Sequence, residues 1–539
     1  MRPRNEFILA ELIAARAEAT PDLDVLTFEH PGGDGGAAAD EVRTFADLHA
    51  HANRIAAALV ERGVKPGDRF ALMMQNHPEF VETMIAASIS GAIFVPIDPR
   101  TRGDKLAFML ANSGCAGIVC GEPCLPEVEA VRARLPDLRW TLVRETTLRE
   151  VLARTAATVD VRAGDADAPL QIMYTSGTTG DPKGIVGANY RFCAAGMLGT
   201  LFGYRSDDRP YTGLSLTHGN AQAVTLAPAL VMGLRAVFSP RFTKSRLWDV
   251  CRRHGCTTFS LVGGMATAIY SEPPRPDDGD NPVRLVVSGG MPPAIWRPFE
   301  TRFGVDVLEF YGAMDGGGMA YKPVGEGPVG SFGKPMPGIE MQVLDEAGNA
   351  CAPGVVGEIC VRPVGGGEAS VEYHGNPEAS RRKIRGGWNR SGDMGHSDAH
   401  GWLFFDYRAG GGIRHNGDFI DPSFVEKAIA ELPEVTDVFV YGVGAASGAP
   451  GEKDVVAAIV AAPGARVDPA TIYAACRRSL EANFVPSYLQ IVDEIPKSAS
   501  EKPQERFLRE RFDPGAPNVH RPPSADDSSG SSCRSRPRT

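Results

Sequence analysis

The segment Tyr174–Gly184, with the sequence YTSGTTGDPKG, combines residue types that bind phosphate groups. Its eleven residues include three glycines, four serine or threonine hydroxyls and one lysine. Glycines let successive backbone N–H groups turn toward an anion, while the hydroxyls add donors and Lys183 adds a positive charge. Proline rather than glycine precedes Lys183. The segment therefore predicts phosphate binding but departs from the GxxxxGK[ST] loop of the usual NTPases.

Two glycine-containing segments follow it. Residues 215–222 (SLTHGNAQ) place His218 directly after a short apolar run. An imidazole can take part in proton transfer or shape a pocket, although a single histidine is often a structural residue. Residues 287–292 (VSGGMP) contain Gly289 and Gly290, whose missing side chains would let the backbone lie close to a flat ligand.

Residues 309–315 (EFYGAMD) contain an aromatic ring and a carboxylate. Tyr311 could stack on a flat ligand, and Gly312 would let the backbone pass close to it. Asp315 offers the hard oxygen that Mg²⁺ prefers. Glycines occupy positions 316–318, and we expect their missing side chains to leave room for a broad substrate.

Two further segments carry a carboxylate and a guanidinium group. Asp393 lies in residues 387–395 (GWNRSGDMG), and its carboxylate could accept from both hydroxyls of a ribose. Arg408 lies in residues 406–417 (DYRAGGGIRHNG) and offers a forked set of donors for sugar or phosphate.

A lysine close to the C-terminus completes the set. Lys502 lies in residues 496–508 (PKSASEKPQERFL). An ammonium group placed beside a reacting phosphoryl group would stabilise the negative charge that builds on its oxygens. Lys183 and Lys497 are the alternative candidates for this role.

The elements that must position these residues follow an α/β pattern. From about Phe45 to Cys120, helical apolar spacing alternates with short apolar runs, which predicts a mainly parallel sheet. The same rhythm predicts elements at Leu170–Tyr174, Leu247–His254, Thr258–Val262, Leu285–Ser288 and Val307–Tyr311. From 330 to 406, short alternating strands with many glycines predict a β-rich subdomain.

A small αβ unit is predicted after the glycine-dense residues 408–417. Its elements are a helix at Pro422–Leu432, strands at Val435–Val443 and Asp454–Ala461, and a helix at Ala470–Glu481. The resulting division is an N-terminal domain at 1–407, a C-terminal domain at 408–513 and a disordered tail at 514–539 that is rich in Pro, Ser, Asp and Arg.

Composition indicates a globular enzyme. The chain has 539 residues, of which 43% are apolar and 23% charged, and a net charge of −10 that argues weakly against nucleic acid as a partner. No apolar run is long enough to span a membrane, and Phe7–Ala19 is interpreted as an amphipathic helix rather than a signal peptide. Ten scattered cysteines indicate reduced thiols in a cytoplasmic protein. Within the cluster Cys115, Cys120 and Cys124, buried thiols are favoured over a metal site.

Taken in order, these seven motifs resemble those of the adenylate-forming superfamily, which contains acyl-CoA and aryl-CoA synthetases, luciferases and the adenylation domains of peptide synthetases. The resemblance extends from Tyr174 to Lys502. It implies a large N-terminal domain of layered α/β subdomains with a β-rich subdomain, and a small mobile C-terminal α+β domain. The implied reaction converts a carboxylate and MgATP to an acyl-adenylate and pyrophosphate, after which a thiol gives a thioester and AMP.

The resemblance also implies a role for each motif residue. Lys502 would be catalytic, His218 would gate the acid pocket and Asp315 would hold Mg²⁺. The residues that would bind ATP are Thr175, Ser176, Gly177, Thr178, Thr179, Gly180, Lys183, Gly289, Gly290, Tyr311, Gly312, Met314, Asp393 and Arg408.

Four positions depart from the family pattern. Met314 stands where a threonine usually offers a hydroxyl to the α-phosphate, and Asp315 stands where the family has glutamate. Gly410 replaces the hinge Asp or Lys, and Glu501 replaces a glycine before the catalytic lysine. The first two departures leave a degenerate nucleotide binder as an alternative to an active enzyme.

The acid and its acceptor are less well specified. The hypothesis is an aromatic acid of the benzoate, salicylate or naphthoate type. A small polar acid is the alternative, because the HGNAQ string and the closing segment also look like crotonobetaine or carnitine-CoA ligases. No carrier domain with a phosphopantetheine-serine pattern follows Lys502, so we expect coenzyme A as the acceptor, with loading of a separate carrier protein as the rival.

Overall fold

The computed structural model describes residues 4–30, 40–155, 158–175, 182–262, 264–316, 318–409, 413–415, 418–420, 422–446, 453–480, 482–498 and 501–523. The predictions for residues 176–180 and for the glycines at 410 and 317 lie outside this part of the chain. The side chains of Thr175 and Arg408 also lie outside it.

The first sheet ends at the predicted phosphate-binding segment. It is parallel except at its last pair of strands. The order is β6 (Trp140–Val143), β5 (Cys115–Cys120), β3 (Arg69–Met73), β4 (Ile93–Pro96), β7 (Pro169–Thr175) and β8 (Lys183–Ala188). Strand β7 was predicted at Leu170–Tyr174, and the structure extends it by one residue at each end.

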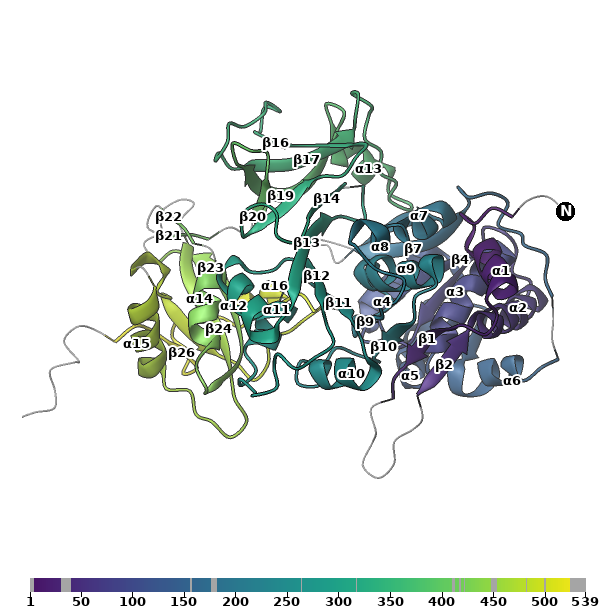
Figure 1. Ribbon diagram of the computed structural model, residues 1–539, viewed down its shortest axis with the longest axis horizontal. Helices are drawn as coiled ribbons and strands as arrows, with labels where there is room; N and C mark the ends of the chain where they lie inside the picture. The colour runs from purple at the N-terminus through teal and green to yellow at the C-terminus, as the bar shows by residue number, and fades with distance from the viewer. Residues whose placement is uncertain are drawn as a thin grey trace, which may run out of the picture.

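A second, longer sheet crosses the molecule and joins two subdomains. Its parallel part runs β13 (Asp306–Gly312), β12 (Leu285–Gly289), β11 (Thr258–Val262), β9 (Pro210–Thr212), β10 (Ala236–Phe238) and β1 (Asp24–Phe28), with β2 (Glu41–Thr44) antiparallel at the edge. Its antiparallel part runs β14 (Met319–Lys322), β15 (Ser331–Pro335), β20 (Leu403–Arg408), β19 (Trp388–Ser397), β17 (Gly357–Pro363) and β16 (Ile339–Leu344), with β18 (Ile384–Arg385) beside β19. This antiparallel part is the predicted β-rich subdomain, and Figure 1 shows it standing above the rest of the molecule.

Helices cover the sheets of the N-terminal part. They are α1 (Leu9–Ala19), α2 (Phe45–Glu61), α3 (Pro78–Ser90), α4 (Gly103–Ser113), α5 (Leu125–Arg132), α6 (Arg149–Leu152), α7 (Asn189–Ala195), α8 (Leu198–Leu201), α9 (Ala227–Met232), α10 (Leu247–His254), α11 (Met265–Tyr270), α12 (Pro293–Phe303) and α13 (Pro377–Lys383), with short turns η1 (Glu122–Cys124), η2 (Arg144–Leu148) and η3 (Ala221–Leu226). Helix α1 forms where a helix was predicted, but Leu9–Ile13 are all buried, so its first turn is covered on every side and not on one face alone.

The C-terminal unit is built on a four-stranded sheet. Its order is β23 (Val435–Gly444), β24 (Lys453–Ala461), β25 (Tyr488–Ile491) and β26 (Val519–His520), accompanied by α14 (Pro422–Ala430), α15 (Pro469–Ser479), η4 (Ala482–Phe484), α16 (Glu505–Glu510) and the hairpin of β21 (Arg414–His415) with β22 (Asp418–Phe419). Figure 1 places it at the left, against α11 and α12. The predicted α/β class with a small C-terminal α+β unit is confirmed.

The predicted tail is wrong over its first ten residues. Residues 514–523 are part of the C-terminal unit, because β26 pairs with β25 and buries Val519. The Pro- and Ser-rich composition hid this short strand, whose only apolar anchor is one valine. Thus the C-terminal unit extends at least to residue 523.

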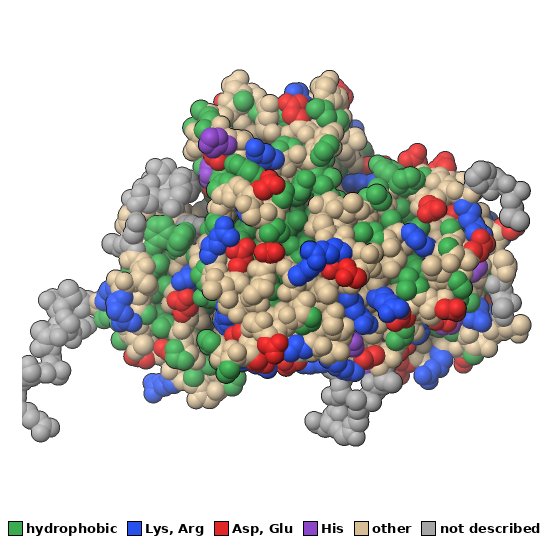
Figure 2. Space-filling model, in the orientation of Figure 1, with side chains coloured by type: hydrophobic (Ala, Val, Ile, Leu, Met, Phe, Trp, Pro, Cys, Tyr) green, Lys and Arg blue, Asp and Glu red, His purple; other side chains and the backbone are tan. Residues whose placement is uncertain are grey.

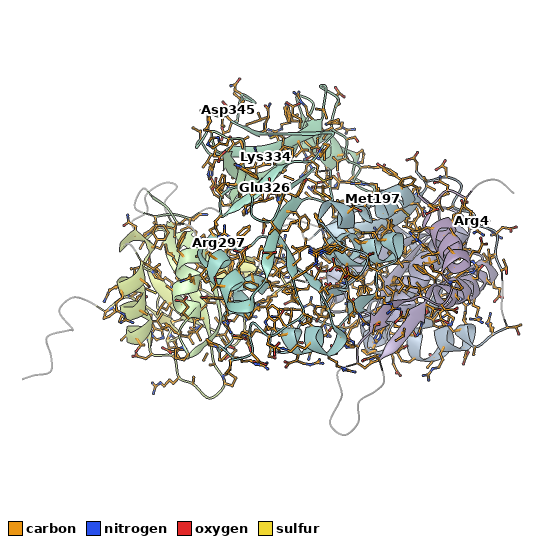
Figure 3. The ribbon with its side chains drawn as sticks, in the orientation of Figure 1. Arg4, Met197, Arg297, Glu326, Lys334 and Asp345 are labelled. Carbon is orange, nitrogen blue, oxygen red and sulfur yellow. The ribbon has the colours of Figure 1, made fainter. Side chains whose placement is uncertain are left out.

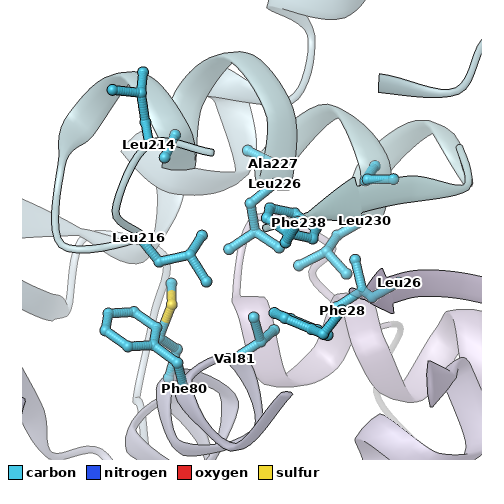
Figure 4. Packing of buried hydrophobic residues seen from close by; sticks show 14 of the residues in the cluster. Leu26, Phe28, Phe80, Val81, Leu214, Leu216, Leu226, Ala227, Leu230 and Phe238 are labelled. Carbon is cyan, nitrogen blue, oxygen red and sulfur yellow. The ribbon is translucent and has the colours of Figure 1, made fainter. Parts of the chain in front are cut away.

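The main core fixes the chain that leads to His218. Phe28 of β1 and Phe238 of β10 stack with ring centroids 5.1 Å apart. Figure 4 shows them beside Phe80 of α3 and Leu216, two residues before His218. Because protein interiors are close-packed, this arrangement restricts where the following segment can lie.

Surface chemistry and thiols match the composition. The face in Figure 2 carries Lys and Arg side chains interspersed with Asp and Glu, and in Figure 3 the exposed Asp345 and Lys334 mark the outer and inner parts of the β-rich subdomain.

Cys115, Cys120 and Cys124 are buried, and burial raises the pKa of each thiol, to about 12, 12 and 11. Among the described residues, no His, Cys, Asp and Glu cluster could hold a metal by itself, and no helix combines the length and apolar character of a membrane span.

Candidate nucleotide and acid site

Tyr311 and Asp393 come together from different subdomains. The Tyr311 hydroxyl on β13 donates to Asp393 Oδ2 on β19 at 2.6 Å, although 82 residues separate them. Arg408, at the end of β20, is the cross-strand partner of Asp393. The tyrosine ring also stacks on Phe332 with centroids 4.7 Å apart. The predicted adenine-binding Tyr311 therefore contacts the predicted ribose-binding Asp393, and the backbone of Arg408 pairs with that of Asp393.

Glu309 holds the glycine turn in place, and sequence reasoning did not single it out. Its carboxylate accepts from the backbone N–H of Gly290 and, at 3.0 Å, from that of Met291. Burial raises the pKa of Glu309 to about 7 despite these donors. The signal available in the sequence was a carboxylate two residues before Tyr311, within a strand that is otherwise apolar.

Asp315 lies in a network of cations and hydroxyls. Lys383 Nζ is 2.7 Å from Asp315 Oδ2, and the Tyr373 hydroxyl donates to the same oxygen at 2.8 Å. Lys183 Nζ lies 5.2 Å from the centre of the Tyr373 ring. The predicted metal ligand and the lysine of the phosphate segment therefore share Tyr373 as a neighbour.

A basic hollow adjoins this network. It has a volume of about 260 Å³. It is lined by Lys183, Glu358, Ala379, Arg382, Lys383, Arg385 and Arg390. Five of these side chains are cationic and one is acidic, so the hollow favours anions. Its position beside Lys183 suits a region that receives phosphate groups.

Met314 packs against Gly219. A Cβ atom built at Gly219 would lie 2.7 Å from Met314 Sδ. The methionine side chain therefore covers Gly219, the residue after His218. In place of the hydroxyl expected at this position, the site has a flexible apolar group next to the predicted acid pocket.

The glycines after Asp315 do not leave open space. A Cβ at Gly316 would lie 2.9 Å from the Ser370 carbonyl oxygen, and one at Gly318 would lie 2.4 Å from Val361. Both glycines also have positive φ values of +77° and +72°. The expectation that they create room for a broad substrate is therefore wrong for these two, because backbone conformation and close packing require glycine.

His218 is partly buried, and the charge of Lys502, the catalytic candidate of the C-terminal unit, acts on it. Burial and, second, the Lys502 ammonium lower the pKa of His218 to about 3. The backbone N–H of Asn220 donates to His218 Nδ1 at 3.2 Å, so the neutral ring carries its proton on Nε2. His218 is thus a neutral donor near Lys502 and not a charged group.

Asn76, which sequence reasoning missed, fixes the segment before His218. Its side-chain nitrogen donates to the carbonyls of Leu214 at 2.9 Å and Ser239 at 2.8 Å, and its oxygen accepts from Leu216 N at 2.8 Å. The side chain is buried. An asparagine in a loop gives no sequence signal for contacts this distant.

The competing lysines are engaged elsewhere. Lys497 Nζ pairs with Asp437 at 2.7 Å within the C-terminal unit, and Lys183 lies over Tyr373. Lys502 follows Glu501, whose φ is +56°. Of the three lysines, Lys502 is the one whose charge acts on His218.

Comparisons with known proteins identify the family of the chain. The AMP-binding enzyme family matches residues 13–366, and the AMP-binding enzyme C-terminal domain matches residues 425–502. A medium/long-chain-fatty-acid–CoA ligase of Mycobacterium marinum is 30% identical over 477 residues, covering 87% of this chain and 92% of that protein.

Two further similarities concern other acids. A crotonobetaine/carnitine–CoA ligase of Salmonella enteritidis is 27% identical over 475 residues, covering 85% of this chain and 91% of the relative. The structure of o-succinylbenzoate CoA synthetase from Bacillus subtilis, in complex with its acyl-adenylate intermediate, is 25% identical with a TM-score of 0.74, covering 92% of this chain and 97% of that one.

Proposed function

This chain belongs to the family of AMP-binding enzymes, and we propose that it joins an apolar, aromatic carboxylic acid to coenzyme A. It is an AMP-forming acyl-CoA ligase that uses ATP, Mg²⁺ and coenzyme A. The observation that carries the residue assignment is the 2.6 Å hydrogen bond from Tyr311 to Asp393, which brings the proposed adenine- and ribose-binding residues together from two subdomains.

The described residues fit the adenosine part of ATP. Tyr311 has one ring face on Phe332, so the adenine would stack on the opposite face. Asp393 would accept from the ribose hydroxyls and Arg408 would donate beside it. Glu309 would keep the backbone at Gly290 flat against the base. The loop residues 175–180 and Lys183 would hold the phosphates.

The site also fits Mg²⁺, because this ion takes few protein carboxylates and completes its octahedral shell with water and phosphate oxygens. Asp315 offers such a carboxylate, and Lys383 beside it would move to the phosphates when the ion binds. Bound there, the ion would neutralise charge on the phosphates. Met314 would contribute packing rather than the usual hydroxyl.

The reaction would proceed in two steps. The acid's carboxylate attacks the α-phosphorus, the bond to pyrophosphate breaks, and Lys502 stabilises the charge on the transferring oxygens. The sulfur of coenzyme A then attacks the acyl carbon and AMP leaves. His218, neutral and protonated on Nε2, would donate to the acid's carboxylate and close one end of its pocket.

Apolar packing beside the site supports an apolar acid. The Phe202 and Phe310 rings lie 5.4 Å apart, and Phe310 contacts the position of Gly289. The o-succinylbenzoate relative favours an aromatic acid. A fatty acid is the second candidate, favoured by the relative at 30% identity. The crotonobetaine alternative has less support, because Asp315 is already paired with Lys383.

An ATP–pyrophosphate exchange assay over benzoates, hydroxybenzoates, naphthoates, fatty acids and betaines tests the acid. We expect exchange with aryl acids, whereas exchange with fatty acids alone would overturn the aromatic proposal. A Lys502→Ala variant controls for contaminating activity. Coenzyme A and a phosphopantetheinylated carrier protein, offered separately, test the acceptor, and a product formed only on the carrier would rule out coenzyme A.

We also propose that residues 1–407 and residues 408–523 form two domains that rotate about residues 408–412 between the two half-reactions. In the part of the chain that the structure describes, the cysteines are free thiols and all but Cys351 are buried, which supports a cytoplasmic location. Limited proteolysis that releases a fragment cut near residue 410, with and without ATP, would test the boundary. Cleavage that begins elsewhere would argue against it.

A further inference from the structure

We propose that Arg100 is a positioning residue for adenylation, because it clamps the segment that carries Lys502 onto the N-terminal part of the molecule. The proposal rests on the function given above, in which Lys502 acts in the first half-reaction. It concerns a contact between the two units of the chain and not a residue that touches ATP.

Arg100 contacts the lysine segment at two points. Its Nη2 donates to the Ser498 carbonyl oxygen at 3.0 Å, and its Nη1 lies 3.6 Å from Glu501 Oε1. Nearly 400 residues of sequence separate these partners. The guanidinium group therefore connects the N-terminal unit to both Ser498 and Glu501 of the C-terminal unit.

The guanidinium group is itself held from the N-terminal side. Asp98, two residues after the end of β4, accepts from Arg100 Nε at 3.1 Å and from the Arg100 backbone N–H at 2.8 Å. The Asp98 side chain is 13% exposed, whereas that of Arg100 is 53% exposed. A largely covered carboxylate thus orients the exposed Arg100 side chain toward the C-terminal unit.

Hydrogen bonds connect Ser498 and Glu501, which contact Arg100, to the backbone of Lys502. Glu501 N donates to the Ser498 carbonyl at 3.0 Å, Ser498 N donates to the Lys502 carbonyl at 2.8 Å, and Lys502 N donates to Ser498 Oγ at 3.2 Å. The Ser498 carbonyl, which accepts from Arg100, therefore belongs to the same small set of hydrogen bonds as the Lys502 backbone. Displacing Ser498 would displace Lys502.

Glu501 gives the second line of support. Its φ of +56° lies in the left-handed region, which costs a residue with a Cβ about 1–2 kcal/mol relative to glycine. Glycine would adopt this conformation without strain. A glutamate here is consistent with a use for its carboxylate, and the carboxylate faces Arg100. Burial raises the pKa of Glu501 and the Arg100 charge lowers it.

The effect should be moderate, because both charges are partly exposed to water. Such pairs contribute on the order of 0.2–1 kcal/mol, and the hydrogen bond to Ser498 adds about the same. We expect Arg100→Gln to lower the rate of ATP–pyrophosphate exchange by about 3- to 10-fold, with the KM for ATP unchanged. Formation of the thioester from preformed acyl-adenylate should keep its wild-type rate.

Four variants separate positioning from general damage. Glu501→Gly relieves the backbone strain and removes the carboxylate, so loss of exchange in this variant assigns the role to the side chain. Arg100→Lys should recover part of the exchange rate lost in Arg100→Gln, because its ammonium group can still donate to the Ser498 carbonyl and is attracted to Asp98 and Glu501. Arg134→Gln is the matched control, because Arg134 forms an ion pair with Asp104 within the N-terminal unit.

Hydrogen exchange tests the positioning of the Lys502 segment without any acid substrate. Hydrogen exchange by mass spectrometry should show faster exchange of residues 497–505 in Arg100→Gln than in wild type or Arg134→Gln. If no acid supports pyrophosphate exchange, the proposed function fails while this measurement still decides the clamp. Unchanged protection of residues 497–505, or equal loss in both half-reactions, would overturn the positioning role.

Discussion

Lys383 Nζ and the Asp315 carboxylate are 2.7 Å apart, with side chains only 13% and 12% exposed. The ammonium group occupies the side of the carboxylate where a divalent cation would be drawn, and the Tyr373 hydroxyl donates to the same oxygen. Asp315, which the sequence predicts to be a metal ligand, is therefore already paired with Lys383 of α13. If Asp315 binds Mg²⁺ as proposed, the lysine and the ion compete for one carboxylate.

This competition predicts the metal dependence of the enzyme. Removing the ammonium in Lys383→Met frees Asp315, so the Mg²⁺ concentration for half-maximal pyrophosphate exchange should fall by about 3- to 10-fold, in line with a charge pair at low exposure. A magnesium titration at saturating ATP measures it. Lys334→Met, which removes a lysine stacked on Trp402 in the β-rich subdomain, should leave the titration unchanged. A higher magnesium requirement in Lys383→Met would mean that Lys383 assists the metal rather than competing with it.

The lysine assignment predicts a separation of half-reactions. Lys502→Ala should lower pyrophosphate exchange by about 100- to 1000-fold, the loss typical of a group that stabilises charge in the transition state. Thioester formation from preformed acyl-adenylate should change far less. Lys497→Ala removes a lysine that is paired with Asp437, and its exchange rate should stay within a few-fold of wild type. A larger loss in Lys497→Ala than in Lys502→Ala would exchange their roles.

Sequence reasoning recovered the elements whose periodicity is regular. The predicted Thr258–Val262 and Leu247–His254 coincide with β11 and α10, because a buried parallel strand and an amphipathic helix each have a characteristic apolar spacing. It also found Tyr311 and Asp393, which the fold places in hydrogen-bond contact.

The missed residues act through contacts that no local pattern encodes. Asn76 reaches Leu214, and Lys383 sits in a run of basic residues that is typical of an exposed helix face, yet its ammonium lies on Asp315. The same limit explains the wrong interpretation of Gly316, where the conformation at φ +77° and the approach of Ser370 are properties of tertiary structure. Spacing identifies which residues can do chemistry, whereas packing decides which neighbours they have.

The depressed pKa of His218 predicts how activity and stability depend on pH. With a pKa of about 3 in the folded protein and about 6.5 in the unfolded chain, His218 stays neutral throughout the working range. Exchange activity between pH 5 and 9 should therefore show no inflection that His218→Gln removes. Stability is lost as pH falls from about 6.5 toward 3, because the unfolded chain binds the proton first. Over that pH range, the free energy of unfolding measured by urea titration should fall more for the wild type than for His218→Gln.

Glu309 predicts the opposite trend. Its pKa of about 7 in the fold exceeds the unfolded value, so its contribution to stability is complete below about pH 4.5 and is lost as pH rises through 7. The shift corresponds to about 3 kcal/mol. Glu309→Gln should be less stable at low pH, because one amide cannot accept from both Gly290 N and Met291 N, but its stability should vary less between pH 4.5 and 8. Urea unfolding at several pH values measures both effects, and parallel curves for the two proteins would contradict the assignment.

Tyr311 offers a test that separates ring stacking from hydrogen bonding. Tyr311→Phe keeps the ring on Phe332 but removes the hydroxyl that donates to Asp393. If the ring binds adenine, this variant should raise the KM for ATP only about 2- to 5-fold, through a less well oriented Asp393. Tyr311→Ala removes the stacking surface as well and should raise it by a further factor of about 10. The KM for the acid should stay unchanged in Tyr311→Phe, because the hydroxyl contacts Asp393 and not the segment at His218. Equal effects of the two substitutions on ATP binding, measured by calorimetry with AMP, would show that the hydroxyl and not the ring face binds the nucleotide.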